Sequence, residues 1–292
     1  MPKLLKKKEK VHPVKQAILK KHKKETVTER ILKDIGKKGA IEVKGREYIK
    51  TGIKGLDELF DFGIPKGATV LMAGGAGSGK TILCLQIIAN AVKEGKKCIY
   101  MSFEESEKRL RQHMEDFKWD ANDMEKKGML LIKRFKLFDI ARSIEAMLSK
   151  AKGDVEIEIE PMILPKDFKP DIIVVDSLTA IASAFIGMER NYRVYIEQLF
   201  LFFEKLNATA FLITETKEVP TVFSPTGVEE FLADGVIVLY NIRKGDIREK
   251  GIEVIKMRGA GHKTRIVAMR IVGGVGIEVY SDVEVFGKIK AE

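Results

Sequence analysis

Residues 70–81 read VLMAGGAGSGKT, an apolar run that leads directly into a glycine-rich loop. The fixed positions of the phosphate-binding template GxxxxGK[ST] are filled by Gly74, Gly79, Lys80 and Thr81. Glycines lack a Cβ, so the backbone of such a loop can curl until its N–H groups point at a polyphosphate. Apolar residues at 82–92 predict the helix whose positive N-terminal end a bound phosphate requires. The chain is therefore predicted to bind a nucleoside triphosphate.

The loop sequence predicts which groups contact the phosphates and which bind Mg²⁺. Backbone groups expected to hold the triphosphate belong to Gly74, Gly75, Ala76, Gly77, Ser78, Gly79 and Lys80. The ammonium of Lys80 would reach the β- and γ-phosphates, and the hydroxyl of Thr81 would bind Mg²⁺. Asp176 ends the apolar run DIIVVD at 171–176, so a buried strand would carry its carboxylate to the same edge of the sheet. We expect Asp176 to help hold Mg²⁺; the alternative is that it only caps the following helix.

A second apolar run, at residues 98–103, ends in Glu104 and Glu105. Hydrolysis of ATP needs a base that orients water in line with the γ-phosphate. A glutamate at the tip of the strand beside the P-loop strand suits that task. The alternative is that both carboxylates only provide favourable charge at the N-terminus of the next helix. The residue pattern leaves the two interpretations open.

A basic segment, KMRGAGH at 256–262, combines Lys256, Arg258 and His262 with a flexible turn. Arg258 could neutralise charge on a transferring phosphoryl group, either in its own chain or in a neighbouring subunit. The alternative is a hairpin with solvated charges. The four histidines of the chain are scattered, so the sequence does not predict a histidine metal site.

Positive charge is concentrated near the N-terminus. The 292 residues carry 52 Lys and Arg against 42 Asp and Glu, and residues 1–50 hold 17 and 6 of them, a net of +11. The rest of the chain therefore holds 35 against 36, a net of −1. We divide the chain into a basic extension at 1–40 and one ATPase domain at 41–292. The extension is expected to be solvated or to dock a protein partner; nucleic acid and an anionic membrane surface are the alternatives.

The sequence shows no pattern typical of secretion or of a membrane span. The chain has no apolar run of about 18 residues and no signal-peptide pattern. Cys84 and Cys98 show neither CxxC nor Cys/His spacing, so neither a disulfide framework nor a cysteine metal site is expected. We expect a soluble, cytoplasmic protein without a membrane span.

The apolar pattern predicts an α/β fold. Strands are expected at 70–73, 98–103, 129–135, 171–176, 210–214, 235–240, 252–257, 265–271 and 276–280, and helices at 80–94, 105–117, 138–151 and 189–206. Alternation of helices with continuously apolar strands indicates a mostly parallel sheet covered on both faces. The last three strands have no helices between them and predict antiparallel hairpins at one edge. Residues 153–170 are expected to form an exposed insertion.

Taken in order, these motifs resemble a single-domain KaiC-like ATPase of the RecA/RadA superfamily, of the kind common in archaea. The segments that carry the resemblance are TGIKGLDEL at 51–59, GIPKG at 63–67, FEE at 103–105, DSLT at 176–179, GVEEFLAD at 227–234, and KMRG at 256–259 with His262. They extend from about Tyr48 to Tyr280. The resemblance implies a RecA-like P-loop core that binds ATP and Mg²⁺ and hydrolyses ATP.

The resemblance also implies roles for the remaining candidates. Glu105, with Glu104 as the alternate, would activate the water. Lys256 and Arg258 would face the phosphates, and His262 the base or ribose, of the nucleotide in an adjacent subunit. This arrangement implies a ring, expected to be a hexamer. Glu230 and Phe231 stand where the clock protein's second domain has its phosphoacceptor Ser-Thr pair, so autophosphorylation at that position is not expected.

The predicted function is a ring-forming regulatory ATPase. One alternative is a RadA-paralogue-like DNA-binding ATPase of repair or recombination, although the sequence shows no recombinase-type helix-hairpin-helix domain. A further alternative is a nucleotide-dependent signalling scaffold.

Overall fold

The computed structural model describes residues 45–137, 140, 164, 167–217, 219–244 and 246–285. The extension predicted at 1–40, the helix predicted at 138–151 and the insertion predicted at 153–170 lie wholly or largely outside these ranges, so they stay predictions. Over the described part of the chain, none of the helices combines the length and the apolar run that crossing a bilayer requires.

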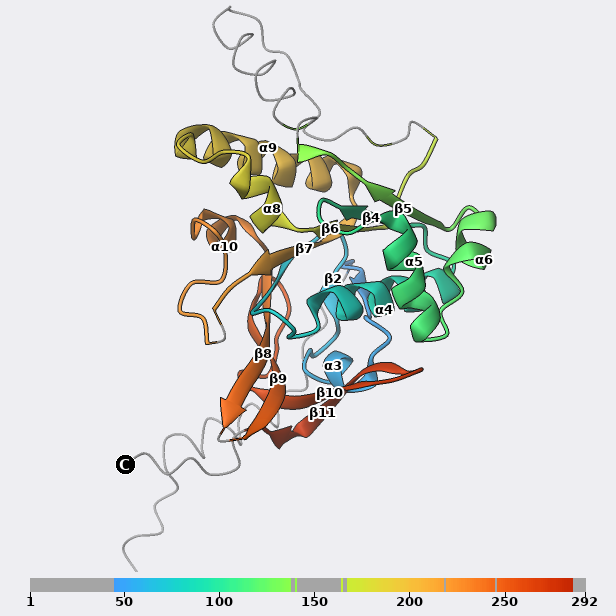
Figure 1. Cartoon of the computed structure of the whole chain (residues 1–292), viewed down its shortest axis with the longest axis vertical. Coiled ribbons are helices and arrows are strands. Elements are labelled where there is room, and N and C mark those ends of the chain that lie inside the picture. The colour runs from blue at the N-terminus through green and yellow to red at the C-terminus, as the bar shows by residue number, and fades with distance from the viewer. Residues whose placement is uncertain are drawn as a thin grey trace, which may run out of the picture. The chain divides into compact units, whose positions relative to one another are not determined.

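A nine-stranded sheet with the order β11-β10-β9-β8-β3-β7-β6-β4-β5 organises the described residues (Figure 1). Its strands are β3 (Thr69–Gly74), β4 (Cys98–Ser102), β5 (Leu130–Arg134), β6 (Ile172–Asp176), β7 (Thr209–Glu215), β8 (Gly235–Lys244), β9 (Ile247–Met257), β10 (Val267–Val272) and β11 (Gly276–Glu284). From β8 to β5 all neighbouring strands are parallel. The strands β9, β10 and β11 add antiparallel pairs at one edge. The predicted mostly parallel sheet with antiparallel C-terminal strands is confirmed.

Helices cover both faces of this sheet (Figure 1). They are α3 (Lys54–Asp57), α4 (Lys80–Lys93), α5 (Glu107–Asp116), α6 (Ala121–Lys126), α8 (Leu178–Ser183), α9 (Glu189–Leu206) and α10 (Val228–Leu232). Val70 and Met72 belong to one buried cluster with residues of α4, α5 and α6. Leu71 and Ala73 belong to a second cluster with residues of α8 and α9. Successive side chains of a strand point to opposite faces, so the one strand β3 contributes to both clusters.

Several short elements were not predicted from the sequence. Besides α3, α6, α8 and α10, they include the antiparallel pair β1 (Tyr48–Ile49) and β2 (Ile64–Pro65). The hairpin of β8 and β9 is also longer than predicted, because its ladder continues from Gly235–Met257 to Lys244–Ile247 through polar residues. A long two-stranded ladder needs no continuous apolar run, so its outer half carries no sequence signal.

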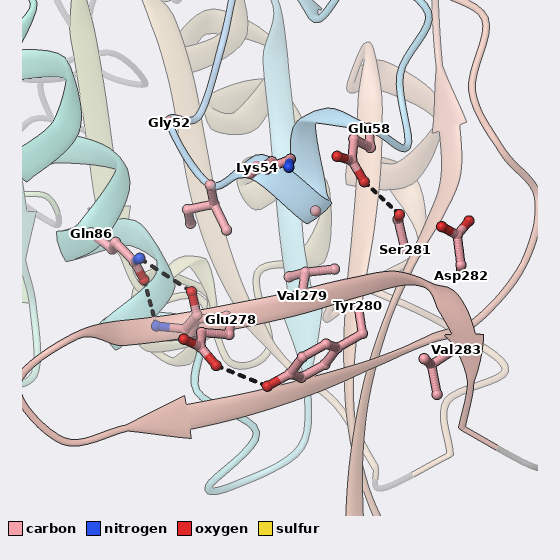
Figure 2. Close-up of a pocket in the computed structure, with 13 residues that line it drawn as sticks. Gly52, Lys54, Glu58, Gln86, Glu278, Val279, Tyr280, Ser281, Asp282 and Val283 are labelled. Atoms are coloured by element: carbon pink, nitrogen blue, oxygen red, sulfur yellow. Dashed lines mark hydrogen bonds between the residues drawn. The ribbon is translucent and has the colours of Figure 1, made fainter.

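The C-terminal hairpin is anchored to the P-loop helix (Figure 2). The side-chain amide of Gln86 on α4 donates to the carbonyl oxygen of Ile277 at 3.2 Å and accepts from its backbone nitrogen at 2.6 Å. Gly55 of α3 lies so close to β11 that a Cβ would stand 1.8 Å from the carbonyl oxygen of Val279. Glu58 accepts a hydrogen bond from Ser281 at 2.5 Å. The strand β11 therefore fixes α3 and α4 against the sheet, and α4 begins at the phosphate-binding loop.

Candidate active site

The glycine-rich loop connects β3 to α4, and two of its glycines have positive φ angles. Gly77 and Gly79 have φ angles of +68° and +106°, a region that side chains with a Cβ rarely adopt. The Lys80 ammonium donates to the carbonyl oxygens of Gly74 at 2.8 Å and Gly75 at 3.1 Å. Burial lowers the pKa of Lys80, and the carboxylates of Glu215, Asp176 and Glu104 oppose that shift. The lysine therefore lies among carboxylates at the mouth of the loop.

The hairpin of β8 and β9 also contacts the loop. The amide of Asn241 on β8 donates to the carbonyl oxygen of Ala76 at 3.3 Å. The ammonium of Lys250 on β9 donates to the carbonyl oxygen of Gly77. Burial lowers the pKa of this lysine, and Arg248 adds to the effect. The sequence analysis did not single out Asn241 or Lys250 as a site residue.

Two oxygen groups suited to Mg²⁺ meet between α4 and β6. Thr81 Oγ1 donates to Asp176 Oδ2 at 3.1 Å, and Asp176 stands at the carboxyl end of β6. A hydroxyl and a carboxylate are hard oxygen ligands of the kind that Mg²⁺ prefers, with waters and phosphate oxygens completing its shell. The donor set at this position therefore fits Mg²⁺.

Asp176 is held in a buried environment. Burial raises the pKa of its carboxyl group to about 6 from an ordinary value of 3.8, while the hydrogen bond from Tyr100 acts in the opposite direction. The hydroxyl of Tyr100 donates to Asp176 Oδ2 at 2.5 Å. Ionisation of the buried Asp176 carboxyl group therefore lowers the stability of the folded protein, and other interactions in the fold offset that loss.

Asp176→Asn is expected to stabilise the protein at neutral pH. The folded-state pKa of about 6 lies above the ordinary 3.8, so ionisation of Asp176 removes stability as the pH rises through that window, and the loss is complete above it. At about 1.4 kcal/mol per pKa unit, the variant should be about 3 kcal/mol more stable near pH 7. The advantage should vanish towards pH 4. Denaturant unfolding of both proteins measures it, and a difference independent of pH would contradict the account.

The paired glutamates after β4 point to different partners. Glu104 Oε1 accepts a hydrogen bond from Ser177 Oγ at 2.5 Å, next to Asp176. Glu105 Oε2 lies 3.0 Å from His113 Nε2 and 3.3 Å from Arg109 Nε, both on α5. One glutamate is therefore directed to the end of β6 and the other to a neighbouring helix.

A cavity of about 370 Å³ brings most of these groups together. Its lining includes the loop residues Ala76, Gly77, Gly79 and Lys80, together with Thr81, Glu104, Glu105, His113, Asp176 and Glu215. The ends of β3, β4, β6 and β7 thus contribute to one site, as the carboxyl edge of a parallel sheet predicts. Glu215 and His113 were not singled out as site residues from the sequence.

Lys256, Arg258 and His262 lie elsewhere in the chain. Met257 pairs with Gly235, which pairs in turn with Val70 at the start of β3, so this end of β9 is at the edge opposite the P-loop. The ammonium of Lys256 donates to the carbonyl oxygen of Glu230 at 2.8 Å.

The other two basic residues, Arg258 and His262, are not among the residues that line the cavity either. The Arg258 guanidinium donates to the carbonyl oxygens of Phe231 at 2.6 Å and Leu232 at 3.3 Å, at the C-terminus of α10. Both ring nitrogens of His262 are buried without a hydrogen-bond partner among the described residues. Within one chain, the basic segment is therefore not part of the cavity.

Comparisons with known proteins agree with this fold. The sequence model of the family described as "ATPase: KaiC" matches residues 49–284. The circadian clock protein KaiC3 of Synechocystis is 32% identical over 243 residues, which are 82% of this chain and 46% of that relative. The UPF0273 protein of Pyrococcus horikoshii is 32% identical over 237 residues, which are 80% of this chain and 94% of that relative. This chain thus spans less than half the length of the clock relative.

A solved structure supports the same assignment. The crystal structure of a KaiC-like protein from hyperthermophilic Pyrococcus horikoshii OT3 matches with a TM-score of 0.65 and 31% identity, over 80% of this chain and 99% of that one. The family match covers the P-loop, both glutamates, Asp176 and the basic segment. The chain therefore belongs to the KaiC family of ATPases and has its RecA-like fold.

Proposed function

We propose that this chain hydrolyses ATP with Mg²⁺ and works as a ring, expected to be a hexamer, with each active site at a boundary between two copies. The observation that carries the proposal is the convergence on one cavity of a P-loop lysine, two oxygen groups suited to Mg²⁺ and a further carboxylate: Lys80, Thr81, Asp176 and Glu104. The regulatory role and the cytoplasmic location expected from the sequence are part of this proposal.

The P-loop side of the site would bind the triphosphate. Backbone N–H groups of 74–80 would hold the phosphates in the turn that Gly77 and Gly79 allow, and Lys80 would exchange its carbonyl partners for phosphate oxygens. Thr81 and Asp176 would hold Mg²⁺, which when bound neutralises charge on the phosphate oxygens. The 3.1 Å bond between them supports this pairing.

We assign the water-orienting role to Glu104, the second choice of the sequence analysis. Both glutamates act electrostatically on Asp176, Glu104 more strongly, but of the two only Glu104 is among the carboxylates that act on Lys80. The Ser177 hydroxyl fixes the orientation of the Glu104 carboxylate. Glu105 is instead engaged by His113 and Arg109. A base must lie within hydrogen-bond reach of the attacking water, and these contacts favour Glu104 for that position.

The basic segment would serve a neighbouring copy. Gly74 lies four residues beyond Val70 along β3, which at about 3.3 Å per residue is about 13 Å from the strand end beside Lys256 and Arg258. Charges at that end cannot stabilise phosphoryl transfer at their own P-loop. An arginine supplied in trans by a second protein performs this task in other P-loop phosphoryl transfers. We propose that Lys256 and Arg258 face the neighbour's phosphates and that His262 lies near its base or ribose.

The test is phosphate release from ATP, measured with Mg²⁺ and with EDTA on fractions of known mass. We expect Mg²⁺-dependent turnover in the assembled fraction and slow turnover in the monomer. Equal rates with EDTA, or full turnover by the monomer, would contradict the proposal. Light scattering coupled to gel filtration provides the mass of each fraction.

A further inference from the structure

Tyr100 is a buried polar residue whose position the proposed site does not yet explain. It lies in the middle of β4, its side chain is fully buried, and its hydroxyl donates to Asp176 Oδ2 at 2.5 Å. In the ladder between β4 and β6, Ser102 pairs with Asp176 and Tyr100 pairs with Val174. Residues two apart on a strand share a face, so the tyrosine ring extends diagonally under the carboxylate.

The carboxylate receives two hydroxyl donors on the same oxygen. Thr81 Oγ1 from α4 and the Tyr100 hydroxyl from β4 both donate to Oδ2. A hydroxyl can donate its proton to a carboxylate while a lone pair faces a metal ion, so the Thr81 bond is compatible with metal binding. With Oδ2 held by hydroxyls from two elements, Oδ1 is the oxygen that neither of these donors occupies.

The cost of misplacing this group is high because the site is buried. Asp176 is only 5% exposed, and a buried carboxylate depends on hydrogen-bond donors in place of water. Phenylalanine in place of Tyr100 would fill the same space but would leave Asp176 Oδ2 with the Thr81 donor alone. Groups that orient a metal ligand from behind often change metal affinity about 10- to 100-fold when they are removed.

We propose that Tyr100 is a positioning residue for the metal carboxylate: its hydroxyl holds Asp176 Oδ2 so that Oδ1 is presented to Mg²⁺. The inference rests on the proposed function, because it assigns a role within that same site. Tyr100 would touch neither the nucleotide nor the reacting atoms.

The experiment measures Mn²⁺ binding, by its electron paramagnetic resonance signal, in the presence of a non-hydrolysable ATP analogue. Tyr100→Phe should weaken Mn²⁺ binding about tenfold. It should leave binding of the analogue in EDTA within about twofold, because the phosphate-binding loop itself is unchanged. Unchanged Mn²⁺ affinity in Tyr100→Phe would overturn the proposal.

A matched control exists on α9. Tyr192 is 2% exposed and its hydroxyl donates to Glu229, which is fully buried, so Tyr192→Phe removes the same kind of bond outside the lining of the candidate active site. This control should keep the Mn²⁺ affinity of the unsubstituted protein. An equal loss in Tyr192→Phe and Tyr100→Phe would show a general packing effect and overturn the proposal.

A double-substitution cycle tests whether Tyr100 acts through Asp176. In an Asp176→Asn background, Tyr100→Phe should have no further effect on Mn²⁺ affinity, whereas equal losses in both backgrounds would overturn the positioning role. Failure of the proposed function gives a different result: absent hydrolysis shows in the phosphate-release assay, and an absent metal–nucleotide site shows as no Mn²⁺ binding with the ATP analogue even in the unsubstituted protein and in Tyr192→Phe.

Discussion

Glu104→Gln is expected to lower ATP turnover about 100- to 10,000-fold, the range that loss of a general base produces. The amide keeps the size of the side chain and can still accept the 2.5 Å hydrogen bond from Ser177. It cannot take a proton from the attacking water. Binding of Mg²⁺-ATP should therefore change little, and the loss should appear in kcat measured at saturating ATP.

The neighbouring glutamate provides the matched control. Glu105→Gln weakens the contacts with His113 at 3.0 Å and Arg109 at 3.3 Å. It leaves the Glu104 carboxylate and its hydrogen bond from Ser177 in place. We expect a loss of about tenfold or less. A larger loss for Glu105→Gln than for Glu104→Gln would reverse the assignment and restore the first choice of the sequence analysis. Full turnover in both variants would show that neither glutamate takes part in ATP hydrolysis.

Arg258→Ala is expected to lower turnover about 1,000-fold in assembled protein, because an arginine that stabilises transferring phosphoryl charge from a neighbouring subunit contributes that much or more. The P-loop of the variant is intact, so affinity for ATP should fall much less than kcat. Steady-state kinetics on a fraction of measured mass tests this expectation. Full turnover in an assembled Arg258→Ala sample would contradict it.

A local structural role of Arg258 must be separated from this effect. Its guanidinium holds carbonyl oxygens at the end of α10 and lies 4.0 Å from Asp234. Asp234→Asn weakens the local ion pair and keeps the guanidinium, and its amide oxygen can still accept from the Thr69 nitrogen, a bond of 3.0 Å. We expect this control to keep turnover within about threefold, since exposed ion pairs contribute little stability. Melting temperatures of both variants complete the comparison.

The elements that carry the motifs could be predicted because each has a strong local pattern. β3, β6 and α9 combine continuous or helically spaced apolar residues with clear ends, and their observed bounds follow the expected ones closely. The short helices α3 and α10 have four and five residues, too few to establish a periodicity. The position of α3 depends on packing against β11, which is distant in the sequence, and α10 packs against α9.

The contacts that shape the site are long-range, which is why the sequence did not reveal them. Tyr100 is 76 residues from Asp176, and Asn241 and Lys250 are 165 and 173 residues from the loop carbonyls that they bind. Nothing distinguishes a tyrosine inside an apolar strand from any other core aromatic residue. The paired glutamates could be singled out from the sequence, but their partners, His113 and Arg109 on α5 and Ser177 at the start of α8, could not, so the sequence alone could not rank them.

The measurement that tests the central claim most directly is a mixing experiment with two inactive variants. Lys80→Ala lacks the phosphate-binding ammonium but keeps Arg258, and Arg258→Ala has the opposite defect. In mixed rings, an Arg258→Ala copy beside a Lys80→Ala copy completes one site across their boundary. If the copies assort at random in equal amounts, about one quarter of the sites are complete, so about one quarter of the original turnover should return. No recovery above the two separate proteins, in assemblies that mass measurement shows to be mixed, would contradict a site shared between copies.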